Sequence, residues 1–94
     1  MTEKDTYTTR MKFLLDEMNA SIKELEILTK QRDSVTQSIF HDEMRKLKEQ
    51  AEIAREKLTQ LRSAGANSWS ELVIEYDHLF QALSRSYQYF KTQI

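Results

Sequence analysis

Residues 63–68 read Ser-Ala-Gly-Ala-Asn-Ser and hold the only glycine, Gly65, of a 94-residue chain without proline. On both sides of this stretch, apolar residues recur in alternating steps of four and three. That spacing places them along one face of an α-helix. We therefore expect two helices that meet at residues 64–67, with Gly65 as a left-handed C-terminal cap and Ser68 with Glu71 as a capping box.

The two apolar ladders predict an all-α fold, an antiparallel helical hairpin with coiled-coil packing. The first helix is expected over residues 5–64 and the second over residues 67–93, within a single domain of residues 1–94. Small side chains of one ladder would face large ones of the other, which favours dense packing. The hairpin core is predicted to comprise Phe40, Met44, Leu47, Ala51, Ala54, Leu58, Leu61, Trp69, Val73, Tyr76, Phe80, Leu83, Tyr87 and Phe90.

The N-terminal half of the long helix carries a further apolar seam that this hairpin leaves bare. A helix over residues 5–64 would be roughly 90 Å long, and the second helix would cover only about 40 Å of it. Leaving the seam in water would forfeit roughly 1.5–3 kcal/mol per side chain, so we expect a second copy to pack antiparallel along it. The predicted homodimer interface comprises Met11, Leu15, Met18, Ile22, Leu25, Leu28 and Val35.

A bend in the long helix is the alternative. The apolar register slips after Leu25, and residues 31–38 are the weakest helix-forming segment of the first half. Ser34 and Gln37 resemble a capping box there, although the segment contains no Gly, Pro or Asn. A bend at this point would close a three-helix bundle and cover the seam within one molecule.

Composition limits the class of protein. The absence of cysteine removes disulfides, thiolate metal sites and a cysteine nucleophile. A net charge of −1 argues against nucleic-acid binding, which usually requires a clustered basic excess. No apolar run approaches the roughly 20 residues of a membrane span, and the first residues lack the apolar stretch of a signal peptide. We expect a soluble, cytoplasmic protein.

Side chains that could support chemistry are few. Glu75 and His78 have the spacing of a di-metal ligand pair, but the second such pair that these sites need is missing. His41, Asp42 and Glu43 point in different directions around a helix, so they do not converge on one ion. One glycine cannot build a phosphate-binding loop. The sequence thus predicts no metal, no cofactor, no small-molecule substrate and no enzymatic activity.

The function expected from these features is that of a non-enzymatic coiled-coil structural or protein-interaction module. It would associate with itself through the N-terminal half of the long helix, and an unidentified protein partner stays open. The alternative is a peripheral membrane or stress-protective amphipathic protein, because the last helix repeats its aromatic residues at eleven-residue intervals. That helix has only Arg85 and Lys91 as basic residues, which disfavours contact with a membrane surface.

Three stretches of the chain resemble a family of small uncharacterised bacterial coiled-coil proteins. They are Leu15-Asp-Glu-Met-Asn-Ala-Ser-Ile22 with Leu25-Glu26, Lys57-Leu58-x-x-Leu61-Arg62-x-Ala64, and Trp69-x-x-Leu72. The resemblance implies a long charged helix, a short turn and a tryptophan-bearing amphipathic helix, and some members are associated with stress responses. Members often place a second tryptophan where this chain has Phe80. The family brings no catalytic or binding residues.

Overall fold

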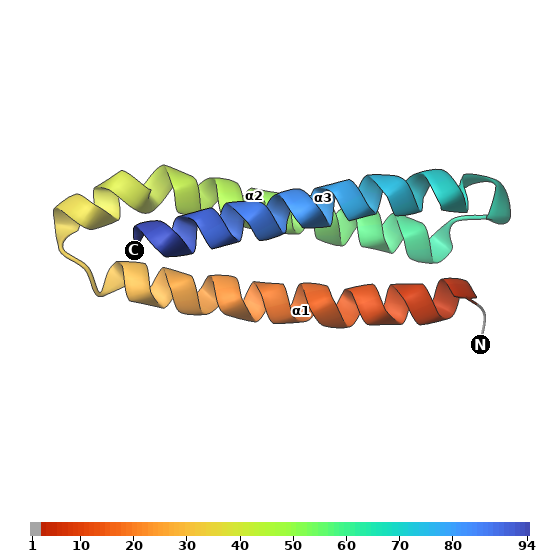
Figure 1. Cartoon of the computed structure of the whole chain (residues 1–94), viewed down its shortest axis with the longest axis horizontal. Coiled ribbons are helices and arrows are strands. Elements are labelled where there is room, and N and C mark those ends of the chain that lie inside the picture. The colour runs from red at the N-terminus through yellow and green to blue at the C-terminus, as the bar shows by residue number, and fades with distance from the viewer. Residues whose placement is uncertain (1–2) are drawn as a thin grey trace.

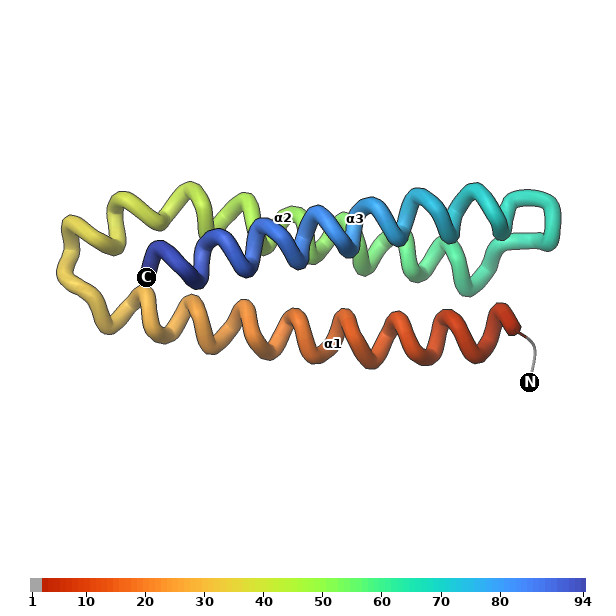
Figure 2. The backbone as a smooth tube through the Cα atoms, viewed as in Figure 1, coloured from red at the N-terminus to blue at the C-terminus, as the bar shows by residue number. Residues whose placement is uncertain are grey.

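The computed structural model describes residues 3–94, which form three α-helices: α1 (Glu3–Lys30), α2 (Ser34–Ser63) and α3 (Ala66–Gln93). The helices lie side by side, with α2 antiparallel to both α1 and α3 (Figure 1). The molecule is a rod of 50 × 20 × 18 Å, and its two turns lie at opposite ends (Figure 2). Residues 3–94 contain no strand, and none of their helices is long and apolar enough to cross a membrane. The all-helical prediction is confirmed.

The predicted uninterrupted helix over residues 5–64 is wrong, because the chain leaves the helical conformation at Gln31–Asp33. Asp33 has φ −65° and ψ 166°, and its Oδ1 accepts a hydrogen bond of 2.8 Å from the backbone N–H of Thr36. The side chain thereby satisfies one of the N–H groups that a helix start leaves without an acceptor. The break lies inside the segment 31–38 at which the alternative places a bend.

The second turn is made differently from the expected one. Gly65 has φ −77° and ψ 170°, an extended backbone rather than a left-handed cap, and it stands at the N-cap of α3. Ser68 donates its backbone N–H to the Gly65 carbonyl at 3.2 Å, and no side chain caps this helix start. The predicted Ser68–Glu71 capping box is therefore wrong. Lys4 Nζ, from α1, donates to the carbonyl of Ala64 and ties the first helix to this turn.

One apolar core runs the length of the rod and draws on all three helices. Every residue predicted for the hairpin core either is buried in it or packs against it. The buried apolar residues are Leu15, Ile22 and Leu25 from α1, Met44, Leu47, Ala51, Ala54, Leu58 and Leu61 from α2, and Tyr76, Leu83 and Phe90 from α3.

Helix α1 packs mainly on α2 and makes fewer contacts with α3. At one end of the rod, Tyr7 packs edge-to-face on Trp69, with ring centroids 5.5 Å apart and planes at 87°. At the other end, Arg32 donates to the carbonyl of Ile94 at 2.9 Å. The edge-to-face geometry of the aromatic pair is favourable and joins α1 to α3 at the first end. At the other end, the contact joins the turn after α1 to the residue that follows α3.

Tyr76 is a polar exception in the core. Its side chain is completely buried, and its hydroxyl has no hydrogen-bond partner among residues 3–94. Burial, and secondarily the neighbouring Tyr7, raises the pKa of the Tyr76 hydroxyl. The ring lies against that of Phe80, with centroids 6.0 Å apart. The phenol therefore contributes apolar packing while its oxygen carries an uncompensated desolvation cost.

We predict that Ile22→Ala lowers the free energy of unfolding by about 2–5 kcal/mol, because it removes buried methyl groups and leaves a cavity between α1 and α2. Phe13→Ala is the matched control, since Phe13 lies on the same helix but is 61% exposed. Its effect should stay within about 0.5 kcal/mol. Urea denaturation followed by circular dichroism measures both, and equal effects would mean that α1 does not pack into the core.

We predict that Tyr76→Phe leaves the free energy of unfolding unchanged or raises it by up to about 2 kcal/mol, because the variant no longer buries an unpaired hydroxyl. Tyr89→Phe, at a position 68% exposed, should change it by less than about 0.5 kcal/mol. A clear loss of stability in Tyr76→Phe would show that the hydroxyl is hydrogen-bonded, for example to a buried water.

Candidate interaction surface

The seam predicted to bind a second copy lies mostly inside the single chain. Leu15, Ile22 and Leu25 are buried, and Met11 and Met18 pack against the core. The last two members of the predicted interface differ, since Leu28 is 49% and Val35 68% exposed. A dimer formed through this seam would therefore require α1 to leave its place on α2.

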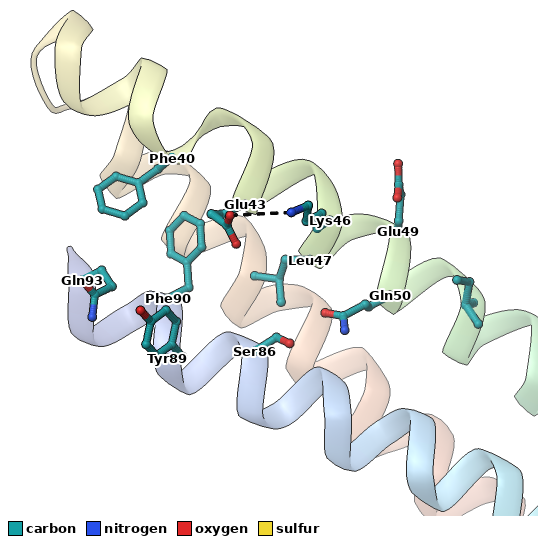
Figure 3. A pocket seen from close by; sticks show the side chains of 11 residues that line it. Phe40, Glu43, Lys46, Leu47, Glu49, Gln50, Ser86, Tyr89, Phe90 and Gln93 are labelled. Carbon is teal, nitrogen blue, oxygen red and sulfur yellow. Dashed lines mark ion pairs between the residues drawn. The ribbon is translucent and has the colours of Figure 1, made fainter.

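A groove lies between α2 and α3, and all of its lining residues come from these two helices. We call it the outer groove. It has a volume of about 320 Å³, and Phe40, Leu47 and Phe90 form its apolar floor, as Figure 3 shows. The rings of Phe40 and Phe90 meet there with centroids 5.3 Å apart. A concave apolar floor of this kind suits an apolar side chain of a partner.

The walls of the outer groove are polar and carry both charges. On the α2 wall, Lys46 Nζ lies 3.9 Å from Glu43 Oε1, and both side chains are exposed. Gln50 and Gln93 add uncharged polar groups (Figure 3). These side chains can fix the orientation of a bound segment, but the residues lining the groove include no nucleophile paired with a base.

Exposed apolar side chains extend this surface along α2. Ile53 and Tyr89 border the groove, at 49% and 68% exposure. Val35 and Ile39 are also exposed and lie, by helical spacing, on the same side of α2 as Ile53. We call the outer groove together with Val35 and Ile39 the outer face. Exposed large apolar side chains beside an apolar groove are a common feature of interaction surfaces.

The groups considered for metal binding do not converge. Glu75 accepts a hydrogen bond of 2.8 Å from Lys57, which belongs to α2, and His78 is exposed. His41, Asp42 and Glu43 are each exposed. In the described part of the chain, no three His, Cys, Asp or Glu side chains come together in a way that could hold a metal ion.

The turn between α1 and α2 is held by polar side chains that sequence reasoning assigned only in part. Gln37 does not complete a capping box. Its Nε2 instead donates to the carbonyls of Lys30 at 3.0 Å and Arg32 at 2.7 Å. The hydrogen bond from the backbone of Thr36 lowers the pKa of Asp33. All these groups are exposed, so the bonds contribute modestly.

One ion pair joins α1 to α2 along the rod. Lys48 of α2 pairs with the carboxylate of Glu26 of α1. The hydrogen bond from Lys48 lowers the pKa of Glu26. The pair spans the contact between the two helices, and because Lys48 is largely exposed it contributes modestly to that contact.

Of the outer face, the sequence analysis named only Val35 as an interface residue, on the N-terminal seam, and it missed the groove. The signal available was the set of α2 apolar residues that stand off the main ladder, namely Val35, Ile39 and Ile53. Only the position of α3 shows that Ile53 faces Tyr89 and Ser86 across a groove.

No protein-family model, curated protein or solved structure matches the chain. The family resemblance therefore stays a prediction.

We predict that the Asp33 cap makes stability depend on pH. Its pKa is lower in the folded chain than in the unfolded one, so the capping bond stabilises the fold at neutral pH. That contribution is lost as the pH falls through the lowered pKa. Asp33→Asn keeps a cap acceptor that does not titrate. Thermal melts between neutral and acid pH should show the wild type losing more stability than the variant, whereas identical pH profiles would contradict the assignment.

Proposed function

We propose that this chain is a non-enzymatic structural and protein-interaction module that associates with a second copy of itself through its N-terminal helix. The observation that carries the proposal is the way α1 is held. Its seam of Leu15, Ile22 and Leu25 packs chiefly on α2, with a smaller contact to α3. Once α1 leaves its own α2, the same seam can pack on the α2–α3 hairpin of another copy.

The size of the domain supports association. A chain of 94 residues without cysteine has only a modest core to stabilise it, and small domains of this kind often gain stability from a partner. The core here is narrow, because the rod that encloses it is only about 20 Å across. A second copy that binds the folded chain would stabilise it by mass action.

The distribution of chemistry supports a non-enzymatic role. The charged side chains lie on the surface in neighbouring pairs such as Lys12 with Asp16 and Arg45 with Glu49, each four residues apart on one helix. Such pairs contribute to helix stability and solubility. The outer face is the surface left for contact with other proteins.

We predict that the protein is a dimer at micromolar concentrations, measured by sedimentation equilibrium. The double variant Ile53→Ser/Tyr89→Ser, at two exposed residues that line the outer groove, tests whether this groove forms the contact. We expect its dimer dissociation constant to stay within about threefold of the wild type, a difference of less than 1 kcal/mol.

A monomer at every concentration would contradict the proposed self-association. If that monomer also shifted its Trp69 emission to the blue with anionic vesicles, a peripheral membrane role would replace the proposal. Loss of the dimer in the double variant would instead move the contact from α1 to the outer groove.

A further inference from the structure

The turn between α1 and α2 contains nothing that forbids a helix. Gln31, Arg32 and Asp33 join the two helices without glycine or proline. The φ of Asp33, −65°, is already helical, and its ψ of 166° is what departs from the helix. The other turn contains Gly65, a weak helix former. Of the two turns, the first is therefore the one that the chain can straighten more readily.

Straightening would exchange one set of hydrogen bonds for another. It would break the Asp33 cap and the two bonds donated by Gln37, all of them exposed. It would restore backbone bonds between residues four apart, which the end of α1 and the start of α2 lack in the turn. The local cost of opening is therefore small, and the main loss would be the contacts of α1.

The buried residues of α1 and α2 would lie on the same face if the two helices were joined into one. Each of three buried α1 residues has a buried α2 residue 36 positions later in the sequence, namely Ala51 after Leu15, Leu58 after Ile22 and Leu61 after Leu25. At 3.6 residues per turn, that spacing is ten whole turns. A continuous helix through the turn thus presents both seams on a single face, ready for a partner that runs alongside.

The pairing of α1 with α2 is also compatible with two-fold symmetry. Leu15 lines the same surface cavity as Leu58, and Ile22 the same one as Ala51. Both pairs are centred between residues 36 and 37, and the Glu26–Lys48 ion pair is centred on residue 37. Two straightened chains that run antiparallel about an axis at this point would re-form each of these contacts between copies.

From this geometry we infer that the dimer forms by exchange of α1: the chain straightens at Gln31–Asp33, and α1 of each copy packs on the α2–α3 hairpin of the other. The inference rests on the proposed self-association and specifies its mode. Exchange of an identical element costs little because the contacts are the same in both forms. The exchanged dimer would be roughly 90–100 Å long, against 50 Å for the single closed chain.

Proline substitution separates the two forms. Ser34 is the first residue of α2, where proline suits a helix start, and the extended Asp33 before it has the backbone that a residue preceding proline adopts. In the straightened helix the same proline would lie in the interior. Ser34→Pro should therefore keep the closed fold and weaken dimerisation at least about a hundredfold. Ala66→Pro, at the matching position of α3, should leave dimerisation unchanged.

Removing the cap should act in the opposite direction. Asp33→Ala eliminates the side-chain acceptor of the turn and places the best helix former at the hinge. We expect dimerisation to strengthen by about three- to tenfold. Circular dichroism and thermal melts of all three variants confirm that each is folded.

Cross-linking tests whether α1 is exchanged. The chain has no cysteine, so chains with Glu26→Cys and chains with Lys48→Cys can be mixed, unfolded and refolded together, then treated with a short bis-maleimide. Exchange predicts a covalent pair of the two different chains, because Glu26 and Lys48 are paired in the contact. Phe13→Cys in place of Glu26→Cys is the control and should not cross-link.

The outcomes distinguish the two proposals. A wild-type monomer at all concentrations overturns both self-association and exchange. A dimer that survives Ser34→Pro and gives no Glu26–Lys48 cross-link between chains overturns exchange alone, and shows closed copies docked on each other. A dimer lost in Ser34→Pro and cross-linked in the mixture supports the inference, with small-angle scattering expected to show the longer rod.

Discussion

Burial of the α1 seam is the constraint on which the rest of the structure depends. The α2–α3 hairpin encloses one face, but α1 carries Leu15, Ile22 and Leu25, which cannot stay in water without a large loss of free energy. Domains of this size are stable by a margin comparable to a few such side chains. The chain therefore turns back at Gln31–Asp33 and covers the seam with its own α2.

The turn that results is only weakly specified by its own residues. Its residues are competent to form a helix, and a few exposed hydrogen bonds from Asp33 and Gln37 hold it. Such bonds contribute little individually, because water competes for the same groups. What stabilises the turn is the distant contact of α1 with α2, including the Glu26–Lys48 ion pair. A second copy could offer the same contact, which is why the proposed exchange of α1 depends on this turn.

The outer face has a different origin. Each of the three helices buries one apolar stripe in the shared core. Helix α2 carries further apolar residues outside its stripe, and these stay exposed. Ile39 and Ile53 are left exposed beside the groove in which Phe40 meets Phe90. Exchange of α1 would not cover this surface, since its lining comes from α2 and α3. The outer groove would stay free for other proteins in either form.

The sequence alone determined that the chain is helical, most of the residues that face the core, and the start of the last helix near Gly65, because helical periodicity records which face of a helix is buried. Leu28 and Val35, predicted on the buried seam, are exposed. Periodicity does not record what covers that face, so only the tertiary structure decided that α1 packs on its own chain. The break at Gln31–Asp33 was predicted only as an alternative, because this segment contains no glycine or proline. Asp33 becomes a helix cap only when α1 folds back on α2. The extended backbone of Gly65 and the outer groove likewise depend on where α3 lies against α2, a relation between segments that local sequence does not encode.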